Sequence, residues 1–301
     1  MTSRPRRQLL DLIWLKPMLY SHATQVVVAT CYPSKMNAGQ ISRSIWPFRT
    51  VLNAVVGNDE APGSSGLFAI PHSALIDRAE RTMDNFFRAK IPVSPGQLLL
   101  LCSRDSAFNS LCSELIAFEA AERAHARRLK ALEEDGCVLL VSLRQATDDI
   151  VLRALARKAG VQHSPPRNEE ERRRRFLEAA SEWESLPLCI NDACNGSSTA
   201  IVRAARTCGR IWGLNLIVVD DLDRLDVGWR RGESPIEALA RKVALLRSVA
   251  QEFSVAIVVL VRLASRLATS TQSQPGLADL TAMGYVVHAN DLVLFGDLPW
   301  A

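Results

Sequence analysis

The sequence lacks most of the features that would assign it at once to a specialised class of protein. Its seven cysteines contain no C-x-x-C spacing, so neither a disulfide framework nor a zinc site is indicated, and we expect reduced thiols in the core of a cytoplasmic protein. No apolar run is long enough to span a bilayer, so we predict neither a membrane helix nor a signal peptide. The excess of basic side chains is small, 36 against 32 acidic, which permits contact with nucleic acid without arguing for it.

The chain does have the length and apolar content for a full core, with 301 residues of which 48% are hydrophobic. The turn-rich stretch 57–66 is almost without apolar residues and is the best linker in the sequence. We therefore predict an N-terminal extension of unknown role over residues 1–60, a linker with an amphipathic helix over 61–91, and a main domain over 92–301.

The main domain alternates short apolar runs with helical patterns, including a long helix predicted from Leu111 onward. Helices between strands make crossover connections, and a strand that is apolar throughout is covered on both faces. The predicted strands are 98–101, 137–143, 187–192, 214–220, 255–261 and 291–295. The fold class that follows is α/β, with three layers around a mainly parallel twisted sheet.

The run 214–220 ends in two carboxylates, Asp220 and Asp221. Ligands of open parallel sheets bind beyond the carboxyl ends of the strands, and in nucleotide-binding proteins a carboxylate at that position holds Mg²⁺. The alternative is that Asp220 only caps the following turn. The run by itself leaves both interpretations open.

The segment 102–110 follows the first predicted strand, and we predict it to be a loop that opens the next helix. Strand, loop and helix form the frame of a phosphate-binding loop, which works through glycines that expose backbone N–H groups and a lysine that meets the β and γ phosphates. Phe108 and Asn109 stand where a glycine and that lysine belong, and no other lysine lies between Lys90 and Lys130. The sequence thus predicts the strand, loop and helix of a phosphate-binding loop but lacks the glycine and the lysine that bind the phosphates.

Two helical patterns outside this region are candidate interaction surfaces. Residues 72–90 carry an apolar stripe, which either packs on its own domain or docks on a neighbouring subunit. Residues 167–183 carry charges of both signs at (i, i+4) spacing, which favours a solvated face over a nucleic-acid patch.

Several short motifs lie in one order along the main domain. They are Pro95-Gly96-Gln97-Leu98 before the first strand, Val141-Ser142-Leu143 at the end of the second, Pro187 to Asp192, and Gly213 to Asp220, followed by Pro275, Asp279-Leu280, Gly284 and Asp291. From about residue 92 to its end the chain thereby resembles the RecA-like motor domain, a P-loop NTPase fold, of the DnaB family of replicative DNA helicases. In that family the third and fourth motifs read PLYIDD and GLDLIVID. The resemblance covers roughly two thirds of the chain and implies an ATPase fold related to DNA unwinding.

The resemblance also implies ATP and Mg²⁺ as ligands. At several of the positions that bind them in the family, this sequence has a different residue. The positions of the phosphate loop are Ser103, Arg104, Ser106, Asn109 and Ser110. Among these, Asn109 replaces the phosphate-binding lysine. Ser110 and Asp220 retain the two positions that hold Mg²⁺ in the family, so the metal half of the site is inherited while the phosphate half is degenerate.

The catalytic positions implied by the resemblance are substituted as well. Arg144 takes the place of the glutamate that activates the attacking water, and Arg262 that of the glutamine that senses the γ-phosphate. Ser273 and Gln274 replace the Lys-Arg pair that acts as an arginine finger. Between positions 262 and 273, the segment that faces DNA in the family, only Arg262 and Arg266 are basic, which predicts weak contact with single-stranded DNA.

Three hypotheses follow. The first is a non-hydrolysing DnaB-like domain that acts as an interaction or regulatory module around DNA replication, with no cofactor and with copies of itself or a related active helicase as partners. The second is an active ATP-dependent DNA helicase that uses substituted residues. The third is a scaffold with neither nucleotide nor DNA ligand. Simultaneous loss of the lysine and the catalytic base favours the first hypothesis over the second.

Overall fold

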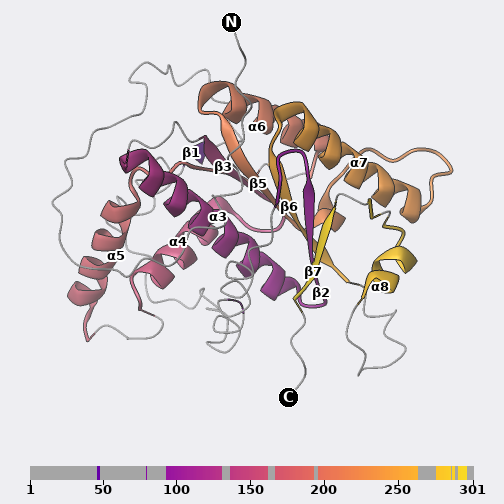
Figure 1. Cartoon of the computed structure of the whole chain (residues 1–301). Helices are drawn as coiled ribbons and strands as arrows, with labels where there is room; N and C mark the ends of the chain where they lie inside the picture. Colours follow the sequence, from indigo (N-terminus) through magenta and orange to yellow (C-terminus); the bar gives the residue numbers. More distant parts are fainter. Residues whose placement is uncertain are drawn as a thin grey trace, which may run out of the picture.

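A seven-stranded sheet forms the centre of the molecule (Figure 1). The structure is a computed structural model that describes residues 46–47, 79, 93–130, 136–161, 167–192, 196–263, 276–285, 287–288 and 291–296. The strands are β1 (Trp46–Pro47), β2 (Leu98–Ser103), β3 (Cys137–Ser142), β4 (Leu188–Asn191), β5 (Leu214–Asp220), β6 (Ala256–Arg262) and β7 (Leu292–Phe295). They lie in the order β1-β4-β3-β5-β6-β2-β7, and only β1 is antiparallel to its neighbour. The predicted α/β fold with a mainly parallel sheet is confirmed.

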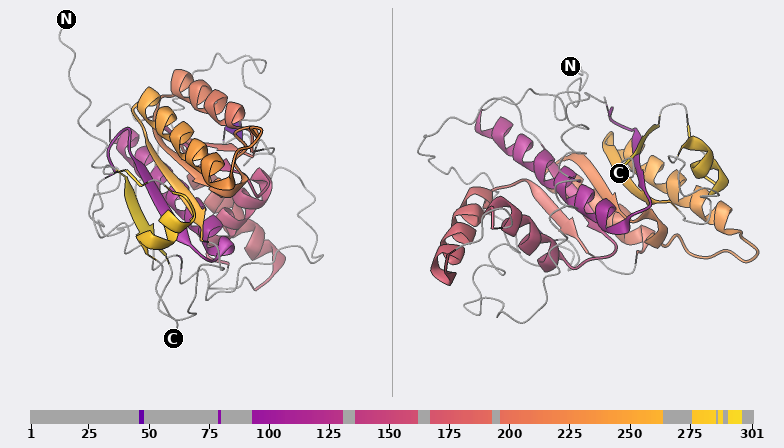
Figure 2. Two further views of the ribbon diagram at one scale, coloured as in Figure 1. Left: turned by 90° about the vertical axis from the view of Figure 1, so that its right-hand side faces the viewer. Right: turned by 90° about the horizontal axis from the view of Figure 1, so that it is seen from below.

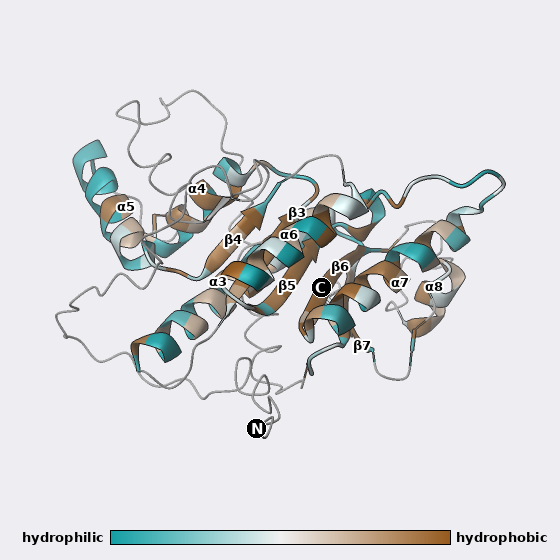
Figure 3. Cartoon of the chain, turned by 90° about the horizontal axis from the view of Figure 1, so that it is seen from above, coloured by the Kyte–Doolittle hydropathy of each residue, from teal (hydrophilic) through white to brown (hydrophobic). Residues whose placement is uncertain are grey.

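Helices cover both faces of this sheet, as the views in Figure 2 show. On one face lie α3 (Ser106–Leu129), α4 (Thr147–Lys158) and α5 (Glu169–Trp183), and on the other lie α6 (Ser198–Ile211), α7 (Pro235–Phe253) and α8 (Leu277–Ala282). A short 3₁₀ helix, η2 (Leu222–Arg224), follows β5. The strands are apolar on both sides (Figure 3) because alternate residues enter different core clusters: Leu99 packs with the α3 layer and Leu100 with the α7 layer. The fold therefore has the three predicted layers.

The start of α3 differs from the sequence prediction. The helix was expected from Leu111, after a loop over 102–110, but it begins at Ser106, and only Arg104 and Asp105 separate it from β2. Asp105 is the reason. Its side chain accepts hydrogen bonds from the backbone N–H groups of Ala107 and Phe108, which satisfies donors that the first turn of a helix leaves unpaired. The cap starts the helix early and removes most of the expected loop.

Among residues 1–92, the structure describes only Trp46, Pro47 and Ala79. Trp46 and Pro47, in the predicted extension, form β1 and pair with Ile190 and Cys189 of β4. The linker at 57–66 lies outside the described residues, as does the predicted helix at 72–90 except for Ala79, which is helical and buried. None of the helices described is both long and apolar enough to cross a bilayer.

Candidate functional site

The carboxyl ends of the central strands bring the predicted site residues to one edge of the sheet. Ser103, at the end of β2, is the Cα partner of Arg262 at the end of β6, and Ser142, at the end of β3, is the partner of Asp220 at the end of β5. This edge is where open parallel sheets bind their ligands. Residues that lie far apart in the sequence are neighbours here because the strands are parallel and in register.

Ser110 and Asp220, the two predicted metal positions, are in direct contact. The Ser110 hydroxyl donates to Oδ2 of Asp220 over 2.8 Å, and the two residues are 3% and 2% exposed. Burial raises the pKa of Asp220 to about 6; the Ser110 hydrogen bond and Arg144 lower it, whereas Asp221 and Glu114 raise it further. Oδ1 of Asp220 is buried without a hydrogen-bond partner. A hydroxyl and a carboxylate with one oxygen free of hydrogen bonds fit Mg²⁺, which prefers oxygen ligands.

The side chain of Asn109 is part of the core. Its Nδ2 donates to the backbone oxygen of Val261 in β6 over 3.0 Å, and the residue is buried. The amide therefore ties the first turn of α3 to β6 and does not face outward from the sheet edge. A lysine at this position would have to leave the contact with Val261 to reach a ligand.

Phe108 also belongs to the core. Its side chain is fully buried with the α3 layer, and a Cβ added to Gly296, just after β7, would lie only 2.5 Å from its ring. The ring is therefore packed against the segment that follows β7, inside the core. Gly296 is required because no side chain can stand so close to the ring.

The N-terminus of α3 is occupied by the protein's own carboxylate. Oδ1 of Asp105 accepts from Ala107 N over 2.9 Å and from Phe108 N over 3.2 Å. The Ser103 hydroxyl accepts from Asp105 N over 2.9 Å and holds the turn between Arg104 and the helix in place. Backbone N–H groups at a helix N-terminus are the donors that bind phosphate in nucleotide-binding proteins. Here two of them are already bonded to an anion, so the residues present do not fit a nucleotide phosphate.

The two arginines at catalytic positions are held in ion pairs. Arg144 Nη1 lies 3.1 Å from Oδ2 of Asp221, a nearly buried residue whose backbone is left-handed with φ 68°. Arg262 Nε lies 3.7 Å from Oδ2 of Asp223 in η2, and this pair is more exposed. Neither arginine can accept a proton from water. Ser273, Gln274 and Arg266 lie outside the described residues.

Sequence reasoning missed one charged group in this region. Glu114, 2% exposed, follows Ser110 by one helical turn and pairs with Arg153 and with Arg157, whose Nη1 lies 3.5 Å from its Oε2. The pairing offsets the cost of burying the carboxylate. The (i, i+4) spacing from Ser110 was the available signal, because it places Glu114 on the same buried face of α3.

A mainly parallel sheet with helices on both faces, and an acid at the end of a central strand bonded to a hydroxyl near the start of a helix, are features of a RecA-like domain of the P-loop NTPase class. The chain belongs to the DnaB-like helicase C-terminal domain family, whose model matches residues 88–297. This confirms the family that the sequence motifs indicated.

Curated relatives are similar over part of their length. The replicative DNA helicase DnaB of Leifsonia xyli is 24% identical over 203 residues, 66% of this chain and 42% of the relative. The replicative DNA helicase DnaB of Nostoc sp. is 27% identical over 152 residues, 49% of this chain and 17% of the relative. Among solved structures, a DnaB-like replicative helicase studied for its interactions with primase has a TM-score of 0.49 and 18% identity, with 62% of this chain and 44% of that chain covered. The chain thus spans less than half of these relatives.

Proposed function

We propose that this chain is a DnaB-like domain of DNA replication that keeps the helicase fold but neither binds ATP tightly nor hydrolyses it, and that it acts as an interaction or regulatory module. The observation that carries the proposal is the Asp105 carboxylate on the N-terminus of α3, where a nucleotide phosphate would bind. The relatives named above are replicative helicases. A domain of that family without its phosphate site is suited to binding partners.

Electrostatics at the start of α3 oppose a phosphate. An incoming phosphate would meet the negative charge of Asp105 and would have to displace its two hydrogen bonds to backbone N–H groups. The usual compensation is a lysine, and Asn109 offers only a neutral amide that already donates to Val261. The wound turn from Ser106 to Phe108 cannot wrap around a β-phosphate without unwinding the helix.

The two positions that orient and activate water in the family hold no general base here. The position of the activating glutamate holds Arg144, which is bound to Asp221, and the sensor position holds Arg262, which lies near Asp223. A cation cannot orient and deprotonate the attacking water. Ser110 and Asp220 could hold Mg²⁺, and the ion would supply charge stabilisation to a phosphate there, but the adjoining helix start does not receive one.

The active ATPase is the second candidate function, and the Ser110–Asp220 bond is the observation that favours it. The active ATPase and the non-hydrolysing module imply the same partners. Under either, a second copy of the chain or a related active helicase is the partner, and single-stranded DNA is at most a weak ligand because the sequence has only two basic residues, Arg262 and Arg266, between positions 262 and 273.

A phosphate-release assay on the purified full chain, with Mg²⁺ and single-stranded DNA present, tests the proposal. We expect release at background level, together with no saturable binding of a fluorescent ATP analogue at concentrations that saturate an active DnaB helicase measured in parallel. The Asp220→Ala variant serves as the control for contaminating activity. Turnover that DNA stimulates and that Asp220→Ala abolishes would establish the active helicase instead.

A further inference from the structure

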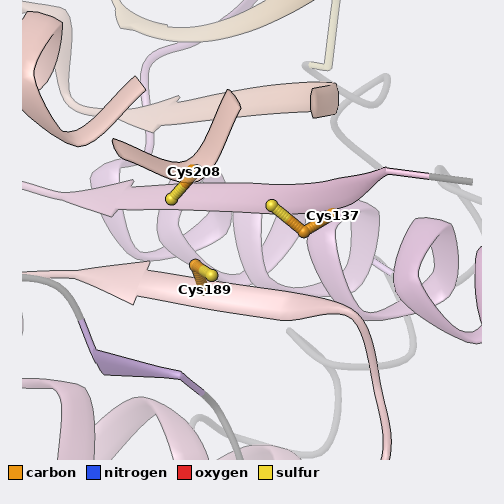
Figure 4. Close-up of side chains that lie close together, drawn as sticks. All are labelled: Cys137, Cys189 and Cys208. Carbon is orange, nitrogen blue, oxygen red and sulfur yellow. The ribbon is translucent and has the colours of Figure 1, made fainter. Parts of the chain in front are cut away.

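Three cysteines that are distant in the sequence meet inside the protein, away from the sheet edge described above. Cys137 is the first residue of β3, Cys189 lies in β4 and Cys208 lies in α6 (Figure 4). Their Sγ atoms all lie within 4.8 Å of one another, and the residues are 2%, 3% and 0% exposed. They belong to the core cluster between the sheet and the α6–α7 layer.

The pairing of β3 with β5 is irregular next to Cys137. Cys137 is the Cα partner of Leu214, but Val138 is the partner of Leu216, so the register with β5 shifts between these two residues of β3. The extra residue of this bulge, Asn215, lies in β5, and Cys137 keeps the normal alternation of β3. Cys189 is the partner of Leu139, two residues further along β3 and on the same face as Cys137. The three thiols therefore converge from three separate elements.

We propose that Cys137, Cys189 and Cys208 form a three-sulfur site for one soft, thiophilic ion, and that the ligand class is trivalent arsenic taken up as arsenous acid. Sulfur ligands select soft ions. Among the described residues, no histidine, aspartate, glutamate or fourth cysteine joins the cluster. Structural zinc takes four ligands, whereas the described residues supply three, all of them sulfur.

Charge balance selects among soft ions. The cluster is packed in apolar surroundings that include Leu139, Ile201 and Ala205, where a net charge is costly. Three thiolates leave a net charge of minus two around Cu⁺ and minus one around Zn²⁺, but they neutralise a trivalent arsenic. As(OH)₃ and three S–H groups give three As–S bonds and three waters. Arsenic stays trivalent, the thiols lose their protons to the departing hydroxides, and both reactants and products are neutral.

Each of the three thiols comes from a different element of the fold: Cys137 from β3, Cys189 from β4 and Cys208 from α6. The product would join β3, β4 and α6 through a single atom.

The competing interpretation is that the three thiols pack only as small apolar side chains. To separate the two, the full chain is incubated anaerobically with arsenite in a thiol-free reductant, both in the native state and during refolding from urea. It is then examined by native mass spectrometry and by counting free thiols. We expect one arsenic per chain, the loss of three titratable thiols and a rise in the midpoint of thermal unfolding.

Matched variants locate the site. Cys137→Ala, Cys189→Ala and Cys208→Ala should each lower the affinity for arsenite at least tenfold. Cys102→Ala and Cys112→Ala, which alter buried cysteines outside the cluster, should leave it unchanged. Cys31→Ala and Cys194→Ala, at positions outside the described residues, should leave it unchanged as well. Equal losses in the cluster variants and the controls, or no arsenic bound under either condition, would overturn the proposal.

X-ray absorption on the arsenic-loaded wild-type chain gives an answer even if a cluster variant does not fold. Three sulfur neighbours and no oxygen are expected around arsenic, and two or fewer sulfurs would contradict the site. In a parallel incubation with zinc, we expect no stoichiometric binding. One tightly bound zinc per chain, lost in the same three variants, would show a fourth ligand and overturn the three-sulfur assignment.

Discussion

The Ser110 hydroxyl donates to Oδ2 of Asp220 over 2.8 Å, although the two residues are 110 positions apart in the sequence. This bond joins the second turn of α3 to the end of β5 and connects the two positions that the sequence indicated for Mg²⁺. Only one oxygen of the carboxylate is satisfied, since Oδ1 has no hydrogen-bond partner. Asp220 is thus a buried carboxylic acid with one oxygen that accepts no hydrogen bond, and its ionisation should change the free energy of unfolding.

Asp220→Asn should stabilise the protein in a pH-dependent way. The pKa of Asp220 rises on folding from 3.8 to about 6, so the folded state holds the proton more tightly than the unfolded state does. Ionisation therefore opposes folding, with a penalty that grows between these two values and is constant above about 6. The variant should gain about 1–3 kcal/mol in unfolding free energy at pH ~8 and almost nothing at pH ~4. Urea unfolding at both pH values measures this, and an equal gain at both would contradict it.

Asp105→Ala should destabilise α3 by about 1 kcal/mol, because it removes an N-cap that accepts two backbone hydrogen bonds. The matched control is Ser197→Ala. Ser197 occupies the N-cap of α6, but its side chain makes no capping hydrogen bond, so its loss should change the unfolding free energy by only a few tenths of that amount. Equal effects of the two variants in urea unfolding would show that the Asp105 cap contributes nothing specific.

Asn109→Lys should lower stability without creating ATPase activity. The substitution breaks the bond to Val261 and places a charge at a buried position, which costs about 2–4 kcal/mol. Ala107→Lys puts the same charge at an exposed position in the same turn and should be nearly neutral. Thermal unfolding and phosphate release are measured for both. Turnover in Asn109→Lys would mean that the missing lysine alone explains the loss of activity.

Gly196→Ala should be one of the most damaging glycine substitutions. Gly196 has φ +64°, and an added Cβ would lie 2.1 Å from the backbone oxygen of Arg224 in the segment that follows β5. We expect a loss of about 3 kcal/mol or more. Gly228→Ala, with φ +72° but no atom near the added Cβ, should cost about 1 kcal/mol from backbone strain alone. Similar unfolding midpoints for the two variants would argue against the contact with Arg224.

Removal of residues 1–90 tests the interaction helix predicted at 72–90. If its apolar stripe docks on a neighbouring subunit, the full chain should oligomerise and the shortened chain should be a soluble monomer. Size-exclusion chromatography with light scattering gives the mass per particle in each case. An unchanged mass would favour packing of the stripe on its own domain, as the burial of Ala79 in the α3 layer also would.

The sequence by itself determined the layers of this fold and the inherited half of its site. Runs such as 214–220 are apolar without alternation, and only a strand covered on both faces has that pattern, so the parallel sheet could be predicted from local composition. Asp220 could be placed at the edge of the sheet because the carboxyl ends of parallel strands lie there, whereas Ser110 was indicated as a metal position only by the family resemblance. Family motifs then identified the domain.

Tertiary structure alone decided which groups the side chains at the edge of the sheet contact and which cysteines meet. The sequence showed that Asn109 is not a lysine, but only the fold showed that its amide is used by Val261 and that Asp105 shortens the loop by capping α3. Likewise Cys137 and Cys208 look unrelated in the sequence. Their contact depends on strand order and on the packing of α6, and long-range contacts of this kind are not encoded in the spacing of neighbouring residues.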